Sequence, residues 1–261
     1  MLVLPPLLRE TLVTSTSHPL DLLLRKLETH SRLEEDDRQA ILALPFTLKT
    51  LEAHSYTVRE GDPPEICGVL VSGFAYRQKL TGDGGRQIVA LHIPGEAVDF
   101  QNLFLDVADH SVQTLTRAEI AFIPRADLQN LARSRAAIGH AILVTMLVEA
   151  SIFREWVLNV GRRDARTRLA HVLCEFAIRL EAQGLADDNG YELPMTQEQL
   201  ADTLGLTPVH VNRTIMALEA QGMIERDKRR IRFPEWRRMR ELGDFNQRYL
   251  HLEPQRSGAV S

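Results

Sequence analysis

Residues 196–213 read TQEQLADTLGLTPVHVNR, which is two short helical patterns joined by a tight turn. Thr196 and Gln199 have the spacing of a capping box, in which two side chains satisfy backbone N–H groups at the start of a helix. Gly205 suits the left-handed backbone conformation of the turn, and Thr207 followed by proline marks the start of the second helix. This stretch predicts a helix-turn-helix.

The second helix has a core stripe and an outward face. Val211, Ile215 and Leu218 recur at helical spacing and are expected to be buried. Arg213 can donate two hydrogen bonds to a guanine, other polar side chains can bond to base edges, and an apolar one can contact a thymine methyl group. The residues expected to read DNA bases are Val209, His210, Asn212 and Arg213.

A basic segment follows this helix. Residues 223–233 read MIERDKRRIRF and predict two short strands around a charged tip, the wing of a winged helix. Its Lys and Arg side chains would neutralise DNA phosphates, which adds affinity without sequence information, and helix N-termini favour phosphates as well. The residues expected to contact phosphate are Thr196, Gln197, Thr207, Lys228, Arg229 and Arg230.

The composition of the whole chain hides this basic region. The 261 residues are enough for about two domains. Their 44% hydrophobic and 25% charged content is typical of a soluble globular protein and excludes disordered and disulfide-rich classes. The net charge is −4, yet residues 205–240 hold nine basic and four acidic residues, a local charge of +5. A nucleic-acid partner is therefore expected at the C-terminal part.

The N-terminal half has the pattern of an antiparallel β domain. Between residues 55 and 123, short alternating apolar runs are separated by glycine and proline. The sequence TGDGG at residues 81–85 predicts a hairpin turn, and residues 112–123 indicate one last strand region. Two helical patterns precede the strands, over residues 20–27 and 34–44.

A long apolar helix is expected between the two halves. Residues 136–153 are mostly apolar but include His140 and Glu149, whereas a membrane-spanning helix needs about 20 apolar residues with few charges. We expect a helix packed between two protein surfaces, in a cytoplasmic protein without membrane association. A break is expected at residues 159–161, and Asp164 is suited to cap the next helix.

Four segments follow from these patterns, and together they predict an α+β fold. Residues 1–17 lack the basic start of a signal peptide and are expected to be a loose tail. The segments expected after it are a β-rich domain over residues 18–134, a connecting helix and hinge over residues 135–161, and a DNA-binding domain over residues 162–261.

This order of parts resembles the Crp–Fnr family of bacterial transcription regulators, from about His18 to Tyr249. The most specific stretches are residues 161–170, which read GRRDARTRLA, and the helix-turn-helix. The resemblance implies an N-terminal antiparallel β-roll related to cyclic-nucleotide-binding domains, a long dimerisation helix and a C-terminal winged helix-turn-helix. It also implies a homodimer that binds a palindromic site on double-stranded DNA and works with RNA polymerase.

The chain departs from the family members that bind cyclic AMP. Their phosphate cassette carries a Gly–Glu pair and later an Arg–Ser pair, and the corresponding places hold Asp99–Phe100 and His110–Ser111. Without the arginine no permanent cation would neutralise the cyclic phosphate, and Asp99 adds like charge. Asp99, Phe100, His110 and Ser111 are therefore expected to line a pocket for an effector of unknown identity other than cyclic AMP.

No metal, cofactor or enzyme chemistry is expected. The cysteines Cys67 and Cys174 lie far apart, and the acidic and histidine residues around His110 match no standard ligand spacing. The sequence shows no Gly-rich phosphate loop and no nucleophile elbow. The remaining alternative is a ligand-binding or protein-interaction module whose helix-turn-helix serves assembly, and the basic wing argues against it.

Overall fold

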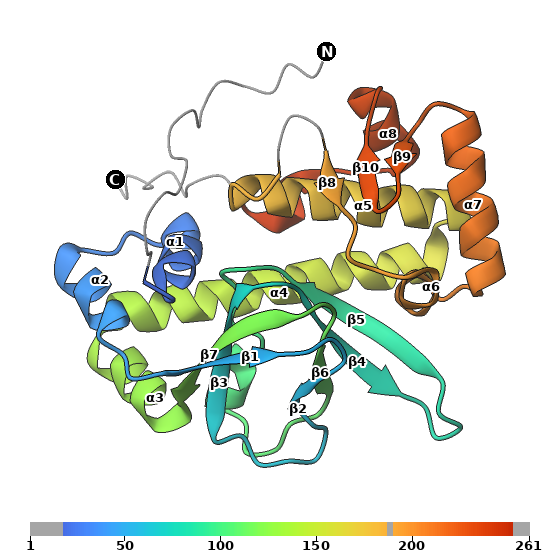
Figure 1. Cartoon of the computed structure of the whole chain (residues 1–261). Helices are drawn as coiled ribbons and strands as arrows, with labels where there is room; N and C mark the ends of the chain where they lie inside the picture. Colours follow the sequence, from blue (N-terminus) through green and yellow to red (C-terminus); the bar gives the residue numbers. More distant parts are fainter. Residues whose placement is uncertain (1–17, 187–189, 253–261) are drawn as a thin grey trace.

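The computed structural model describes residues 18–186 and 190–252, so the predicted tail over residues 1–17 lies outside the described part of the chain. Figure 1 shows an N-terminal β domain, one long helix and a C-terminal helical domain with a small sheet. The α-helices are α1 (Asp21–His30), α2 (Glu35–Leu42), α3 (Arg125–Ser134), α4 (Ala136–Arg162), α5 (Ala165–Ala182), α6 (Gln197–Leu204), α7 (Pro208–Ala220) and α8 (Trp236–Leu242). The 3-10 helices are η1 (Phe100–Leu103) and η2 (Gln247–Leu250). The strands are β1 (Thr47–Leu51), β2 (Tyr56–Val58), β3 (Ile66–Ser72), β4 (Ala75–Leu80), β5 (Arg86–His92), β6 (Ser111–Thr114), β7 (Ala118–Pro124), β8 (Tyr191–Glu192), β9 (Glu225–Asp227) and β10 (Arg230–Arg232).

The N-terminal domain is a β-roll made of two antiparallel sheets. Strands β1, β7 and β3 form a three-stranded sheet, and β2, β6, β4 and β5 form a four-stranded one. Apolar side chains from both sheets form the core between them, among them Leu70, Val112 and Ile120. The hairpin turn after β4 forms as predicted, since the Thr81 N–H donates to the Gly85 carbonyl oxygen at 2.8 Å. The predicted α+β fold is confirmed.

The prediction of a single strand region over residues 112–123 was wrong. The segment contains β6 and β7, which belong to different sheets. The chain turns between them at Leu115, which is buried and whose N–H donates to the Phe74 carbonyl oxygen at 2.7 Å. Because the turn itself faces a core, the apolar pattern continues across it, and periodicity alone does not reveal the change of sheet.

Gly73 closes the turn between β3 and β4 in a left-handed conformation, with φ +78°. A Cβ atom there would lie 2.4 Å from the carbonyl oxygen of Arg117. Left-handed backbone costs an L-residue about 1–2 kcal/mol, and the backbone clash adds to it, so Gly73→Ala is expected to lower the free energy of unfolding by about 2 kcal/mol or more. Urea denaturation measures the loss. Gly82→Ala is the matched control, because an added Cβ atom there would have no atom within 4 Å apart from its chain neighbours. Equal losses in both variants would contradict this role of Gly73.

The long helix α4 runs through Gly161 to Arg162, so the predicted break at residues 159–161 was wrong. The backbone becomes extended at Arg163. The next helix starts after Asp164, whose carboxylate accepts a hydrogen bond from a backbone N–H, as predicted. A glycine lowers helix stability but does not end a helix unless it adopts the left-handed C-terminal geometry.

One side of α4 is buried in the protein. By length and composition α4 is long and apolar enough to cross a membrane, since 18 consecutive residues of it have a mean hydropathy of 1.8. In the structure it runs between the β-roll and α5 (Figure 1) and also packs on α1. The α4 residues buried in its first half are Ile138, Ala141, Ile142, Thr145 and Val148.

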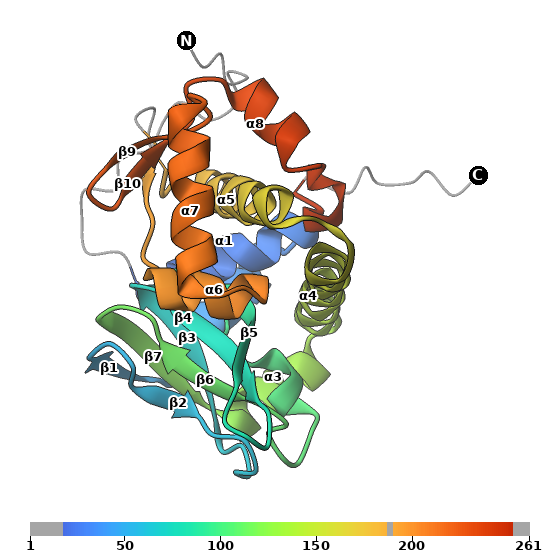
Figure 2. The ribbon, with the colours of Figure 1, turned by 90° about the vertical axis from the view of Figure 1, so that its right-hand side faces the viewer.

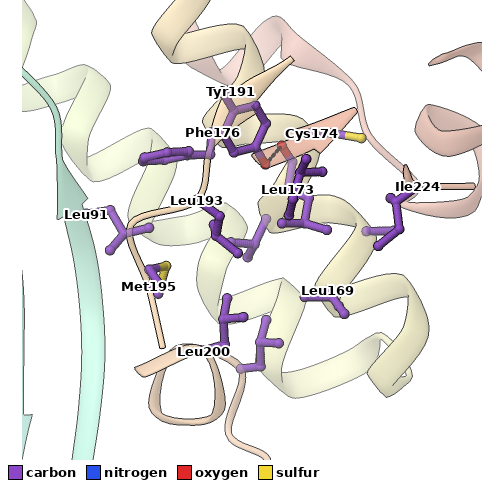
Figure 3. Packing of buried hydrophobic residues seen from close by; sticks show 14 of the residues in the cluster. Leu91, Leu169, Leu173, Cys174, Phe176, Tyr191, Leu193, Met195, Leu200 and Ile224 are labelled. Carbon is purple, nitrogen blue, oxygen red and sulfur yellow. Dashed lines mark hydrogen bonds between the residues drawn. The ribbon is translucent and has the colours of Figure 1, made fainter. Parts of the chain in front are cut away.

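The C-terminal domain has an apolar core between α5, α6, α7 and the small sheet. Figure 3 shows Leu169 and Leu173 of α5 beside Leu193 and Met195 of the segment that leads to α6. The same cluster includes Leu91 of β5. One apolar cluster therefore spans both domains.

Candidate nucleic-acid interface and effector cavity

The helix-turn-helix forms as predicted. At the start of α6, the Gln199 N–H donates to Thr196 Oγ1 at 3.2 Å, and the Thr196 N–H donates to Gln199 Oε1 at 2.8 Å. Gly205 has φ +63°, and the His210 N–H donates to Thr207 Oγ1 at 3.3 Å at the start of α7. These local bonds fix where both helices begin and how the chain turns between them. In Figure 2, α7 stands at the front of the domain.

Helix α7 presents most of the predicted base-reading residues to solvent. Val209 is 70% exposed, and His210 and Arg213 are exposed as well. Within the described part of the chain, the Arg213 guanidinium has no hydrogen-bond or ion-pair partner. Asn212 is half-buried, and its Oδ1 accepts a hydrogen bond from Gln197 Nε2 at 2.9 Å, which ties α7 to α6. The core stripe is buried as predicted and consists of Val211, Ile215 and Leu218.

The wing is a small antiparallel sheet with the strand order β8-β10-β9. Lys228 at its tip is exposed, and no described residue forms a hydrogen bond or ion pair with its ammonium group. Arg229 donates from Nε to the Leu193 carbonyl oxygen at 3.3 Å and from Nη2 to the Pro194 carbonyl oxygen. The Lys228 side chain is therefore exposed to solvent at the tip, whereas Arg229 anchors the wing to the segment before α6. Arg230 is half-buried.

A cavity of about 360 Å³ lies between the β-roll and α4. Phe100 and His110, two of the four residues predicted to line an effector pocket, form part of its wall. Among the described residues, Asp99 and Ser111 are not part of this wall. Asp99 is buried with Oδ1 3.3 Å from His110 Nε2, and Ser111 Oγ accepts a hydrogen bond from the Glu60 N–H at 3.0 Å. Asp99 thus holds His110 in place rather than facing the cavity.

Two cations in the cavity wall, Lys26 and Arg179, share the carboxylate of Glu96. Lys26 Nζ lies 3.0 Å from Glu96 Oε1, and Arg179 Nη2 lies 2.9 Å from Glu96 Oε2. Burial alone would raise the pKa of Glu96, but Arg179 and Lys26 hold that pKa well below its ordinary value. Sequence reasoning missed this cluster. The available signal was Glu175 and Arg179, an ion pair four positions apart in the otherwise apolar stretch of residues 172–180.

Known proteins share both domains of this chain. Residues 48–135 match the cyclic nucleotide-binding domain, and residues 167–242 match the Crp-like helix-turn-helix domain. The solved structure of FixK2 from Bradyrhizobium japonicum is similar, with a TM-score of 0.70 and 25% identity, over 76% of this chain and 98% of that chain. The nitrogen fixation regulation protein FixK of Rhizobium meliloti is 31% identical over 175 residues, which are 66% of this chain and 75% of that protein. The chain belongs to the Crp–Fnr family.

A further Crp–Fnr relative is the transcriptional activator protein FnrL of Cereibacter sphaeroides, which is 29% identical over 201 residues, 75% of this chain and 80% of that protein. The resemblance predicted from residues 161–170 and the helix-turn-helix is thereby confirmed. This Crp–Fnr chain is a DNA-binding transcription regulator with a cyclic-nucleotide-binding-like domain. Helix α4 lies between the two matched domains.

Proposed function

We propose that this Crp–Fnr regulator works in the cytoplasm as a homodimer that binds a palindromic DNA site, with α7 of each protomer in the major groove. The observation that carries the proposal is the face of α7, where Val209, His210 and Arg213 project to solvent beside a basic wing. The proposed units are the β-roll domain over residues 18–134, the dimerisation helix that follows it, and the DNA-binding domain from residue 162.

The exposed side of α4 supports the dimer. Eight of its eleven exposed residues recur at alternating intervals of four and three, the heptad pattern of a coiled coil, and the other three are Phe153, Leu158 and Arg162. Exposed apolar stripes of this kind mark surfaces that a partner covers. Two-fold pairing of α4 would place the two copies of α7 about one helical turn of DNA apart. The stripe consists of Ala136, His140, Leu143, Leu147, Ala150, Arg154, Val157 and Gly161.

The cavity in the β-roll is proposed to receive a signal other than cyclic AMP. A cyclic phosphate needs a fixed cation, whereas the family's arginine position holds His110, which lies next to the buried carboxylate of Asp99. The cations that do line the cavity already face carboxylates: Lys26 and Arg179 are paired with Glu96, Arg77 with Glu149 and Lys79 with Glu60. An occupant in contact with Phe100 and His110 would shift the population of conformations that bind DNA. The output would be a change in contact with RNA polymerase at the promoter.

Selection of binding sites from a pool of random DNA duplexes tests the proposed function. The expected result is an enriched inverted repeat whose half-sites lie about 10 base pairs apart, centre to centre. If no sequence is enriched, the proposal is wrong, and the interaction-module alternative is favoured.

Lys228→Ala is expected to weaken binding to every DNA sequence alike. The Lys228 ammonium group would contact a phosphate. Its loss should make the slope of the logarithm of the binding constant against the logarithm of the salt concentration shallower by about one unit per protomer, and should leave the sequence preference unchanged. Titrations of the selected site and of a random duplex at several salt concentrations measure both effects. Lys49→Ala, an exposed lysine on β1, is the control. A changed ratio of the two affinities would show that Lys228 reads bases instead.

A further inference from the structure

The winged helix is docked on the β-roll through an apolar core. Leu91 of β5 packs with Leu193 and Met195 of the C-terminal domain (Figure 3). The rings of Phe74 and Phe176 meet across the same boundary, with 5.6 Å between their centroids. Apolar contacts are non-directional, so they hold the domains together without fixing one angle between them. Hydrogen bonds, in contrast, require particular distances and angles. Two sets of hydrogen bonds join the β-roll to the C-terminal domain.

The inner set is the Arg179 bridge, which we define as Arg179 of α5 with Glu96, Leu91 and Glu175. Arg179 Nη2 donates to both carboxylate oxygens of Glu96, at 2.9 and 3.1 Å, and to the Leu91 carbonyl oxygen at 2.7 Å. Arg179 Nη1 donates to Glu175 at 3.2 Å, and Trp156 Nε1 of α4 donates to the same carboxylate at 3.0 Å. The bridge therefore joins the β-roll, α4 and α5. Arg179 is only 6% exposed, so its positive charge is stabilised by these hydrogen-bond partners rather than by water.

The outer set is the Arg86 clamp, which we define as Arg86 and Gln87 of β5 with the α6 residues they bind. Arg86 Nε donates to Asp202 Oδ2 at 2.6 Å, and its Nη2 lies 3.7 Å from Glu198 Oε1. Gln87 Nε2 donates to the Thr203 carbonyl oxygen at 3.1 Å. Because α6 packs directly on α7, the clamp restrains the helix-turn-helix itself.

We propose that Arg179 and Arg86 are positioning residues that hold the winged helix on the β-roll at the angle that DNA binding requires. The proposal rests on the proposed function of the dimer. The docked angle leaves Val209, His210 and Arg213 exposed, and in Figure 2 no strand of the β-roll stands in front of α7. Docking thus leaves the DNA surface open. Docking also fixes the orientation of the winged helix before DNA binds. Binding then costs less conformational entropy than it would for a loosely attached domain.

The Arg179 bridge also connects the docking to the cavity. Glu96 and Arg179 both line the cavity wall, and Glu96 is shared with Lys26. An occupant that binds either partner of the bridge would compete for the same hydrogen bonds. A signal in the β-roll can therefore change the angle of the winged helix through this one ion pair.

The paired variant Glu96→Gln/Arg179→Met tests the bridge, because it removes both charges of the Glu96–Arg179 ion pair together. The buried carboxylate of Glu175 loses Arg179 in this variant but keeps hydrogen bonds from Trp156 Nε1 and the Tyr249 hydroxyl, at 3.0 and 2.8 Å. Arg86→Gln tests the clamp at the surface, and it keeps the experiment decisive if the buried variant fails to fold. The control is Asp37→Asn/Arg135→Met, which removes an ion pair of 3.0 Å between α2 and the start of α4, within the N-terminal half. Circular dichroism establishes that each variant is folded.

The readout is the distance between spin labels on Thr50→Cys in β1 and Ala220→Cys at the end of α7, two exposed positions. The native Cys67 and Cys174 are buried, so the introduced thiols react first. Labelled chains are mixed with a large excess of unlabelled chains, so that most labelled dimers carry one label pair. Affinity for the selected DNA site is measured on the same variants without labels.

The expected result is a broader distance distribution in both test variants and an unchanged one in the control. If the docked orientation falls to about a tenth of the population in the paired variant, its Kd for the selected site rises about tenfold. Unchanged distances would overturn the proposal, and so would broadened distances with equal or tighter DNA binding. If the parent chain binds no DNA, the proposed function fails, while the distances still report whether the two sets of bonds fix the domain angle.

Discussion

Leu147→Glu is expected to split the dimer and to lower affinity for the DNA site by about 10²–10⁴-fold, the gain that a second linked binding module supplies. Leu147 lies in the middle of the exposed stripe of α4 and is itself 58% exposed in the single chain. In a coiled coil it would pack into the partner helix, and the substitution would bring two carboxylates into an apolar contact. A buried charge without a partner costs several kcal/mol. Sedimentation equilibrium and gel-shift titration measure the two effects.

Leu80→Glu is the matched control for this experiment. Leu80 ends β4, is 53% exposed and lies outside the stripe. The same leucine-to-glutamate change there should leave both the dimer and DNA binding intact. If Leu147→Glu stays a dimer with full affinity for the site, α4 does not form the interface.

Arg213→Ala is expected to remove most of the discrimination between the selected site and other DNA. A bidentate contact from arginine to guanine contributes about 1–3 kcal/mol of discrimination at each half-site, and a two-fold dimer suffers the loss twice. In this structure no other described residue binds the Arg213 guanidinium, so the change should leave the free energy of unfolding unaltered. Titrations of the selected site, of variants with one changed base pair and of a random duplex measure the effect.

Arg238→Ala controls for the loss of a positive charge. Arg238 is exposed on α8, outside the helix-turn-helix. Its removal should leave the ratio of specific to random affinity unchanged. If Arg213→Ala behaves in the same way as this control, Arg213 does not read a base, and specificity comes from another part of α7.

Local features of the fold were predictable from the sequence, and those that depend on distant partners were not. The capping box at Thr196 and the left-handed Gly205 depend on neighbours within a few positions, and both predictions are confirmed. The split of residues 112–123 into β6 and β7 depends on which sheet each half joins. The bond between Arg179 and Glu96 joins residues 83 positions apart. No period in the sequence specifies such a pair.

The candidate site shows the same division. The outward face of α7 follows from helical spacing, so the exposure of Val209 and Arg213 was predictable. The roles of Arg229 and Asp99 were not predictable, because each side chain also contacts groups that are distant in the sequence. Arg229 binds carbonyl groups before α6, and Asp99 lies beside His110. The sequence shows that a charged residue is present, but only the fold shows which groups its side chain contacts.

The open face of α7 has a consequence for the evolution of this regulator. Val209, His210 and Arg213 contribute little to the core, and substitutions at such surface positions usually change stability by less than about 0.5 kcal/mol. A lineage can therefore change these three side chains, and with them its target genes, without losing a folded protein. Helix α4 lacks that freedom, because one of its sides is buried in the fold. In this fold, new DNA specificities are therefore expected to arise by substitutions at the start of α7.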